Sequence, residues 1–127
     1  MIAGGVAVCH HGAPRLVGDL DILYLPEQEN VRRLISALKP LGYLFPDDYP
    51  LRLQSPSAQC KLPTHNAELL GHLAGVETNA AIRDAAVADA AGRSVPVLGL
   101  AQLKASKLAS ARPRDLEDLA ALARAGV

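Results

Sequence analysis

Aromatic residues are nearly absent from this sequence of 127 residues, which has no Trp, one Phe and three Tyr. Half of the residues are nevertheless hydrophobic, so Ala, Leu and Val must fill the core, and the abundance of Ala and Leu favours helices. A chain of this length buries roughly two-thirds of the surface that its unfolded form exposes. We therefore expect one globular domain over residues 1–127, with helices packed on a modest sheet.

The sequence also lacks a net charge, because 13 Lys and Arg residues balance 13 Asp and Glu residues. This balance excludes the global electrostatic attraction that a dedicated nucleic-acid or acidic-membrane binder carries, so any contact with a polyanion must be local. No hydrophobic run approaches the ~20 residues that a membrane span needs. The sequence therefore predicts a protein that does not bind a membrane.

Cysteine is scarce as well. Cys9 and Cys60 lie far apart, form no CxxC pair and follow no secretory signal, which predicts reduced thiols and a cytoplasmic location. His10 and His11 follow Cys9, but adjacent residues on a helix diverge by about 100° and cannot easily share one zinc ion. His11 would end the short helix expected here, at a place where the resemblance of the sequence to a known family, described below, implies a role in capping the helix or positioning a loop.

The hydrophobic pattern of the first half predicts a strand, a helix, a strand and a second helix. Residues 1–12 carry a Gly pair ahead of a short apolar stretch, which indicates a strand stub, a tight turn and a short helix. Residues 19–25 first alternate and then become continuously apolar, as is typical of a mostly buried strand closed by Pro26. Residues 27–41 place apolar side chains at three- and four-residue steps, which predicts an amphipathic helix.

The middle of the chain is less regular. Residues 51–53 and 58–62 look like a hairpin of short strands, and residues 66–73 fit a further strand. Residues 80–91 are dominated by Ala and are compatible with either a helix or a strand.

The last third predicts one strand and two helices. Residues 94–98 indicate an edge strand, because Pro96 cannot donate a hydrogen bond to a ladder. Helices are expected over residues 100–111 and 113–125, the second with Pro at a first-turn position. The predicted fold class is α+β, with a short mixed sheet and its helices packed on one side of it.

The first chemical signal is the sequence Asp19-Leu-Asp21. Residues two apart on a strand point to the same face, so the two carboxylates would lie a few ångströms apart, where oxygen ligands suit Mg²⁺ or Mn²⁺. The alternative is that the two acids merely cap a strand edge. Upstream, Gly4 and Gly5 allow a backbone to approach a phosphate closely and leave amide N–H groups at a helix start. A phosphate loop and a metal site would thus occupy one short segment.

The run from Gly4-Gly5 to Asp19-Leu-Asp21 resembles the signature of the minimal nucleotidyltransferases: a Gly-Gly or Gly-Ser turn, a short helix, and Asp-x-Asp on the next strand. Near the C-terminus, Lys107 followed by Arg112-Pro-Arg-Asp115 resembles the closing segment of bacterial families in this superfamily, among them abortive-infection-type toxins. The resemblance covers most of the chain. It implies a polymerase-β-like nucleotidyltransferase fold.

The resemblance also implies a catalytic metal site. Asp19 and Asp21 would bind Mg²⁺ or Mn²⁺, and a third acid on a later strand would complete the site. That third acid falls on Glu68, where the families usually have Asp. A Glu reaches one methylene further than an Asp, so its carboxylate can still ligate a metal.

The expected contacts to a nucleoside triphosphate are Gly4, Gly5, Arg15 and Lys107. Lys104 and Lys107 lie three residues apart on one helix face, which suits either a phosphate-facing edge or a solvated face. If Lys107 faces the nucleotide, we expect Lys107→Ala to weaken nucleotide binding while thermal stability stays nearly unchanged.

Two further acids have a structural interpretation. Asp115 and Asp118 lie in the first turns of the last predicted helix, where negative charge is favourable, and Arg112 with Asp115 would form a local pair.

The expected function is metal-dependent transfer of a nucleoside monophosphate from a triphosphate to a hydroxyl of a protein, a small molecule or RNA. Zero net charge and few aromatic residues do not favour a large RNA acceptor. The alternative is a catalytically silent relative that binds a nucleotide or a partner protein, which Glu68 and Val17 favour because the families usually have Asp and Thr there. Because only three residues precede Gly4, we also expect a homodimer that covers a sheet edge.

Overall fold

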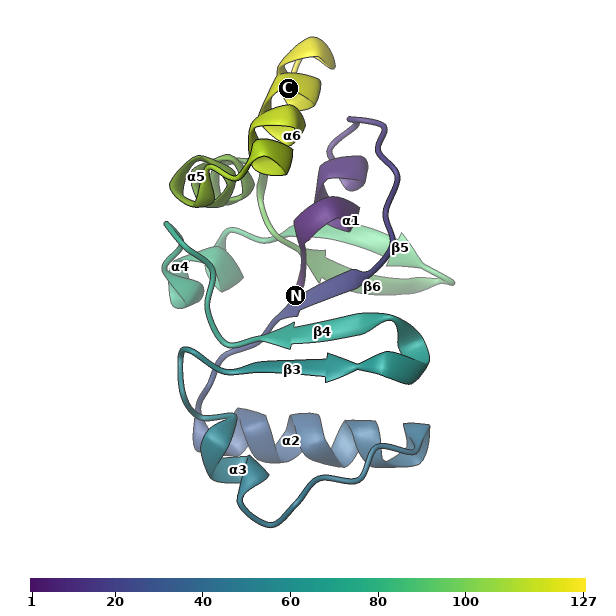
Figure 1. Cartoon of the computed structure of the whole chain (residues 1–127). Coiled ribbons are helices and arrows are strands. Elements are labelled where there is room, and N and C mark those ends of the chain that lie inside the picture. Colours follow the sequence, from purple (N-terminus) through teal and green to yellow (C-terminus); the bar gives the residue numbers. More distant parts are fainter.

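The computed structural model describes residues 1–127 and has an α+β fold with six strands in one mixed sheet, in the order β3-β4-β2-β1-β6-β5 (Figure 1). The strands are β1 (Ile2–Ala3), β2 (Leu20–Leu23), β3 (Gln59–Leu62), β4 (Ala67–Leu70), β5 (Ala86–Ala90) and β6 (Arg93–Val97). The helices are α1 (Gly4–His10), α2 (Gln28–Leu38), α3 (Tyr49–Arg52), α4 (Thr78–Arg83), α5 (Leu100–Ser110) and α6 (Pro113–Arg124). Two 3₁₀ turns, η1 (Lys39–Leu41) and η2 (Pro63–His65), follow α2 and β3.

The middle of the sheet brings together strands that are far apart in the sequence. β2 is antiparallel to β1 and parallel to β4, and β1 is parallel to β6. Hairpins formed by β3 with β4 and by β5 with β6 complete the two sides. In this register Asp21 lies opposite Ala3 on one side and Glu68 on the other. The two strands that carry the expected acids are therefore direct neighbours.

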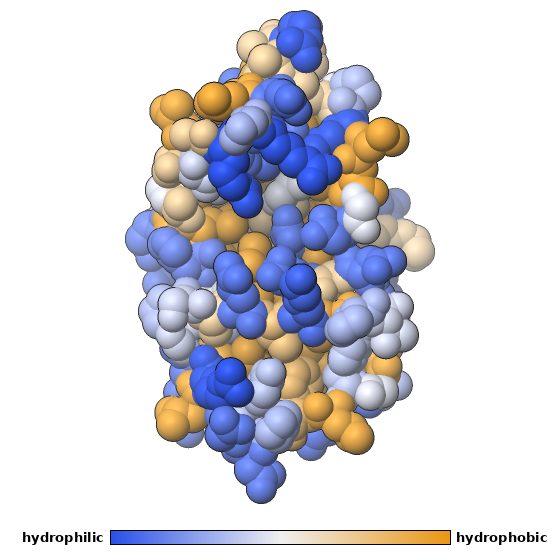
Figure 2. Space-filling view, in the orientation of Figure 1, coloured by the Kyte–Doolittle hydropathy of each residue, from blue (hydrophilic) through white to orange (hydrophobic).

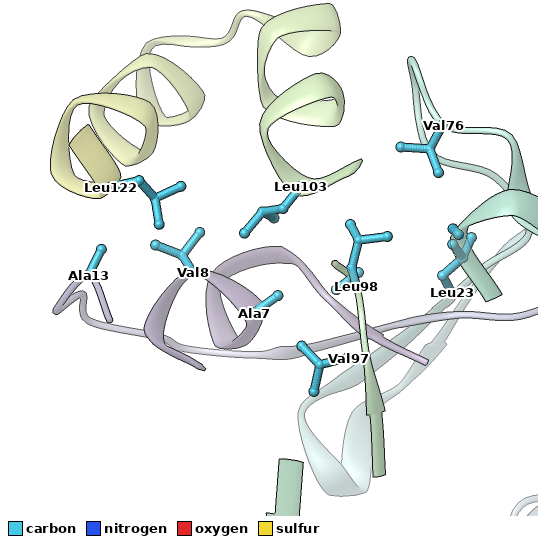
Figure 3. Packing of buried hydrophobic residues seen from close by; sticks show 11 residues of the cluster. Ala7, Val8, Ala13, Leu23, Val76, Val97, Leu98, Leu103 and Leu122 are labelled. Carbon is cyan, nitrogen blue, oxygen red and sulfur yellow. The ribbon is translucent and has the colours of Figure 1, made fainter. Parts of the chain in front are cut away.

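Two hydrophobic cores cover the two faces of the sheet. One core joins the sheet to α1, α4, α5 and α6, and Figure 3 shows Val8, Leu103 and Leu122 from three of these helices pointing toward one another. The other core joins the sheet to α2 and α3. Along β2, Leu23 belongs to the first core while Ile22 packs against the second.

The expectation that the helices pack on one side of the sheet is therefore wrong. Figure 1 shows α2 and α3 at one end of the view and α1, α5 and α6 at the other, with the sheet between them. The apolar run from Ile22 to Leu25 places hydrophobic side chains on both faces of β2, and both faces must be removed from water.

The longer elements agree with the sequence pattern. The strand stub and short helix at the start, the strand β2, the amphipathic helix α2 and the two C-terminal helices are confirmed. β4 confirms the strand expected within residues 66–73. The ambiguous segment at residues 80–91 contains the end of α4 and all of β5, separated by a turn. Here Glu77 caps α4 by accepting hydrogen bonds from the backbone N–H groups of Asn79 and Ala80.

The hairpin expected at residues 51–53 and 58–62 is wrong in its first half. Residues 49–52 form the short helix α3, and β3 pairs with β4 instead. Pro50 lies in the first turn of α3. A backbone N–H in the first turn has no acceptor within the helix, so the N–H that Pro lacks costs no hydrogen bond. The buried Leu53 then anchors the turn in the second core.

The expectation that residues 94–98 form an edge strand is also wrong, because β6 lies between β1 and β5. The backbone N–H of Leu98 donates to the carbonyl of Ile2 at 2.8 Å. The nitrogen of Pro96, two residues earlier, faces the same side, where β1 pairs with β6 only at Ile2 and Val97. The missing N–H of Pro96 therefore interrupts no ladder.

Both cysteines are free thiols. No helix of the protein is both long and apolar enough to cross a membrane.

The edge strands are β3 and β5, and β1 lies inside the sheet, so the open edge beside Gly4 on which the expected homodimer rested does not exist. The homodimer itself stays a prediction.

Candidate metal and nucleotide site

The three acids expected from the sequence lie together. Asp21 and Glu68 are opposite one another on the parallel strands β2 and β4, and Asp19 immediately precedes β2. One carboxylate oxygen from each residue lies within 4.8 Å of the other two. Asp19 is exposed, and the other two acids are partly buried. The parallel pairing of β2 with β4 thus creates a group of three oxygen ligands on one face of the sheet.

Asp21 lies close to two other negative charges, which disfavour its ionised form. Burial raises the pKa of Asp21, and the charges of Asp19 and Glu68 raise it further, while Lys107 and Arg112 act in the opposite direction. Carboxylate oxygens at this spacing suit hard divalent cations such as Mg²⁺ and Mn²⁺. A bound cation would remove the repulsion, so the donor set and its charge both fit such an ion.

The glycine pair makes room for two charged side chains of the site. Gly4 has a φ of +60°, and a Cβ at this position would collide with the carboxylate of Asp21. A Cβ on Gly5 would collide with the guanidinium of Arg15. Gly4 is therefore required where β1 turns into α1, because its φ is positive and a carboxylate of the site lies directly over its backbone, while the guanidinium of Arg15 lies directly over Gly5.

Basic residues reach the same place from α5, from the α5–α6 turn and from the loop before β2. Lys107 Nζ lies 3.1 Å from Asp115 Oδ1 and 2.7 Å from Asp118 Oδ2. Arg15 Nε lies 3.1 Å from Asp118 Oδ1, and Arg112 Nε lies 2.7 Å from Asp115 Oδ2. The expected pair of Arg112 with Asp115 is confirmed, and Asp115 and Asp118 of α6 serve as structural partners of the bases.

The burial of Lys107 argues against the expectation that its replacement by Ala leaves thermal stability nearly unchanged. Its side chain is 8% exposed and lies between two buried carboxylates, because the short α5–α6 turn folds this face of α5 against the start of α6. Removal of the ammonium would leave Asp115 and Asp118 in the interior without their shared cation. The sequence pattern around Asp115 and Asp118 indicates only a local pair and a favourable helix start, and it contains no signal for the contacts of Asp118 with Arg15 and Lys107.

Two hollows meet at the acids. The first, of about 500 Å³, lies between the β3–β4 side of the sheet and α5. The second, of about 270 Å³, is mostly polar. Residues that line both are Asp21, Glu68, Lys107, Arg112 and Asp115. On the face seen in Figure 1, hydrophilic side chains gather over β3 and β4 and over the start of α6 (Figure 2).

The linings of the two hollows differ in chemistry. The first contains apolar residues together with a few hydrogen-bonding groups: Leu70, Leu73, Leu98, Leu103, Gln59, His72, Ser106 and Ser110. The second adds three basic and acidic residues to the shared ones, Arg15, Arg114 and Asp19, and has one hydrophobic residue, Val17. One side of the acids is thus suited to an uncharged molecule with apolar parts, and the other side is suited to an anion.

His11 lies outside both hollows. Its Nε2 is 2.8 Å from the carbonyl oxygen of Leu98, and His11 forms the C-cap of α1. This contact ties the end of α1 to the segment between β6 and α5, which confirms the expected capping and positioning role.

Comparison with known proteins assigns no family: no protein-family model, no curated protein and no solved structure matches this chain. What the site can do therefore follows from its own residues.

Proposed function

We propose that this protein binds a nucleoside triphosphate together with Mg²⁺ or Mn²⁺ and transfers the nucleoside monophosphate to a hydroxyl group. The observation that carries the proposal is the convergence of Asp19, Asp21 and Glu68 within 4.8 Å at the junction of two hollows. The nucleotidyltransferase-like fold belongs to the same proposal, and the antiparallel β1–β2 pair with the glycine turn at its end supports it.

The mixed charge of the site supports a metal-bound polyphosphate in particular. A free triphosphate would be repelled by the three acids, and the bases nearby, among them Arg15 and Arg112, weaken the attraction of the acids for a cation bound alone. A metal complex of a triphosphate satisfies both groups, because the acids ligate the cation and the guanidinium groups donate to phosphate oxygens. The polar hollow is the better place for the phosphates, and the first hollow is the better place for the nucleoside or the acceptor.

In the proposed reaction, the hydroxyl oxygen of the acceptor forms a bond to the α-phosphorus and the bond from that phosphorus to the β-phosphate oxygen breaks. Pyrophosphate leaves, and the hydroxyl proton passes to a carboxylate, for which Glu68 is the candidate, or to water. Divalent cations, when bound, stabilise the charge on the attacking and leaving oxygens. The chain's own residues hold the cations, orient the phosphates and surround the reacting atoms.

One observation favours a second candidate, a catalytically silent module that binds a nucleotide or a partner protein. The ammonium of Lys107 lies between Asp115 and Asp118, which compete with a phosphate for its three N–H donors. If this competition keeps Lys107 from stabilising the leaving phosphate, the site binds a nucleotide without accelerating transfer.

Equilibrium dialysis with α-labelled ATP and millimolar Mg²⁺ tests the proposal. We expect wild type to bind ATP only when Mg²⁺ is present, and Asp21→Asn to bind it at least tenfold more weakly because a metal ligand is lost. Asp47→Asn is the matched control, since Asp47 is exposed in a loop and lies outside both hollows. Equal binding by wild type and Asp21→Asn would contradict the proposed metal site.

A second measurement separates the enzyme from the silent module. Pyrophosphate release is followed with each of the four common nucleoside triphosphates, alone and with added protein, RNA and small hydroxyl compounds. Release that Asp21→Asn lacks and Asp47→Asn retains identifies the transferase, whereas binding of ATP without any release identifies the silent module.

A further inference from the structure

Five side chains from α5, from α6 and the turn before it, and from the loop before β2 form a chain of ion pairs in which positive and negative charges alternate. The order is Arg15, Asp118, Lys107, Asp115 and Arg112, with successive nitrogen-to-oxygen distances of 3.1, 2.7, 3.1 and 2.7 Å. The three inner side chains are almost fully buried, with exposed fractions of 5%, 8% and 2%. Arg15 at one end is 15% exposed, and Arg112 at the other end is 73% exposed. The chain thus begins and ends with a guanidinium and has its acids inside.

Both ends of this chain of charges lie at the same polar hollow. Arg15, Lys107 and Arg112 all line it, together with Asp19 and Asp21. Asp118 contributes no lining to either hollow, although it contacts two of the three bases. Asp118 can therefore act on a molecule in the hollow only through its charge and through the positions of Arg15 and Lys107.

Stability alone does not account for Asp118. Buried ion pairs stabilise a fold little or not at all relative to hydrophobic residues of similar size, because both charges lose their hydration. What such a pair does provide is a fixed geometry. Arg and Lys side chains lose much rotamer entropy when they are fixed, and a base that is already held in place loses less of it when it binds an anion.

We propose that Asp118 is a positioning residue for the triphosphate, which holds Arg15 and Lys107 in the places where they meet the phosphate oxygens. The inference rests on the proposed function, because it takes the ligand of the polar hollow to be a metal-bound polyphosphate. In this proposal Asp118 of α6 never touches the triphosphate and yet affects the affinity of the protein for it.

The direction of the effect distinguishes positioning from simple charge. Asp118→Asn removes a negative charge close to two bases, so charge alone predicts tighter binding of a polyphosphate. Loss of positioning predicts weaker binding, because Arg15 and Lys107 become mobile and must be ordered by the ligand. The two explanations predict opposite signs for the same substitution.

The test is titration calorimetry with inorganic tripolyphosphate in the presence of millimolar Mg²⁺, well below the melting temperature of every variant. We expect Asp118→Asn to bind about tenfold more weakly than wild type. Val31→Ala is the matched control, because it destabilises the fold through the core on the opposite face and should leave the affinity unchanged. Equal or tighter binding by Asp118→Asn overturns the inference, and so does an equal loss in Val31→Ala.

Asp118→Glu keeps the test decisive if Asp118→Asn does not fold. It preserves the charge but displaces the carboxylate by one methylene, so weaker binding supports positioning and unchanged binding overturns it. The proposed function fails separately: wild type that binds no tripolyphosphate with Mg²⁺ overturns the nucleotide site itself, and the inference with it. Wild type that binds while both Asp118 variants bind equally well overturns only the inference.

Discussion

Replacement of Asp21 by Asn removes one of three negative charges from the acid group while it preserves the shape of the side chain. The amide oxygen and nitrogen of Asn occupy nearly the same space as the carboxylate, so the contact over Gly4 is retained. The change therefore tests charge rather than packing. Two quantities respond to it: the stability of the metal-free protein and the increase in stability on addition of a divalent cation.

The size of the first response follows from Coulomb's law. At the 4.8 Å limit of the acid group, two unit charges repel by about 1 kcal/mol in water and about 3 kcal/mol at an effective dielectric constant of 20. Asp19 is exposed, which favours the lower value, and Lys107 and Arg112 offset part of the repulsion. We expect Asp21→Asn to stabilise the metal-free protein by about 1 kcal/mol, or roughly 3–6 °C in Tm.

The second response follows from mass action. A cation that binds only the folded state with a Kd of about 1 mM adds about 1.4 kcal/mol of stability at about 10 mM. Wild type should gain this increment with Mg²⁺ or Mn²⁺, and Asp21→Asn should lose most of it. The pH dependence has a definite sign: because the pKa of Asp21 is raised in the folded state, the repulsion is absent below pH ~4 and appears as the pH rises through the folded pKa.

The assay is thermal unfolding of wild type, Asp21→Asn and the control Asp47→Asn, each with EDTA and with millimolar Mg²⁺ or Mn²⁺. If the two acids merely cap the strand, Asp21→Asn should lower the metal-free Tm and no variant should respond to the cation. Such a result, or a wild type that shows no shift with cation in the presence or absence of ATP, would refute the metal site.

Three other predictions concern the neighbouring residues. Lys107→Ala should lower the free energy of unfolding, measured in urea, by about 3 kcal/mol, because Lys107 pairs with two buried acids. Lys104→Ala, on the same helix and without an ion pair, should change this free energy by less than about 0.5 kcal/mol. Equal effects of the two substitutions would contradict the buried network. Burial raises the pKa of Asp115, but hydrogen bonds from Arg112 and Lys107 outweigh burial and lower this pKa to about 2. The ionised Asp115 therefore stabilises the fold by about 2 kcal/mol above pH ~4, and this contribution disappears as the pH falls toward 2. Acid unfolding of Asp115→Asn should lack this loss between pH 4 and 2, and an unchanged profile would disprove the assignment. Gly4→Ala should destabilise the protein and remove the response to Mg²⁺, because the new methyl group displaces a carboxylate of the site, whereas Gly42→Ala, also at positive φ but facing open space, should keep that response.

Much of the fold could be predicted from local patterns in the sequence. The apolar spacing that defines α2 depends on residues within one helix turn of each other. Gly42 marks the end of the η1 turn that follows α2, and Pro113 marks the start of α6, because the backbones of Gly and Pro favour these positions. Asp19 and Asp21 face one side of β2 because of the two-residue period of a strand. The errors lie where local preference is weak: residues 49–52 are helical because Leu53 is anchored in a core that belongs to α2 and the sheet.

The sequence by itself determined the positions of the main helices, the short glycine turn and the two acids on one strand face, since these depend on residues a few positions apart. Only the tertiary structure decided that Glu68 lies opposite Asp21, because that requires β4 to add in parallel beside β2, across more than forty residues of chain. It also decided that Lys107 is buried between Asp115 and Asp118 and that Arg15 reaches the second of these acids. The physical reason is that the pairing of distant strands and the burial of charges depend on the free energy of the whole packed core, which no short segment contains.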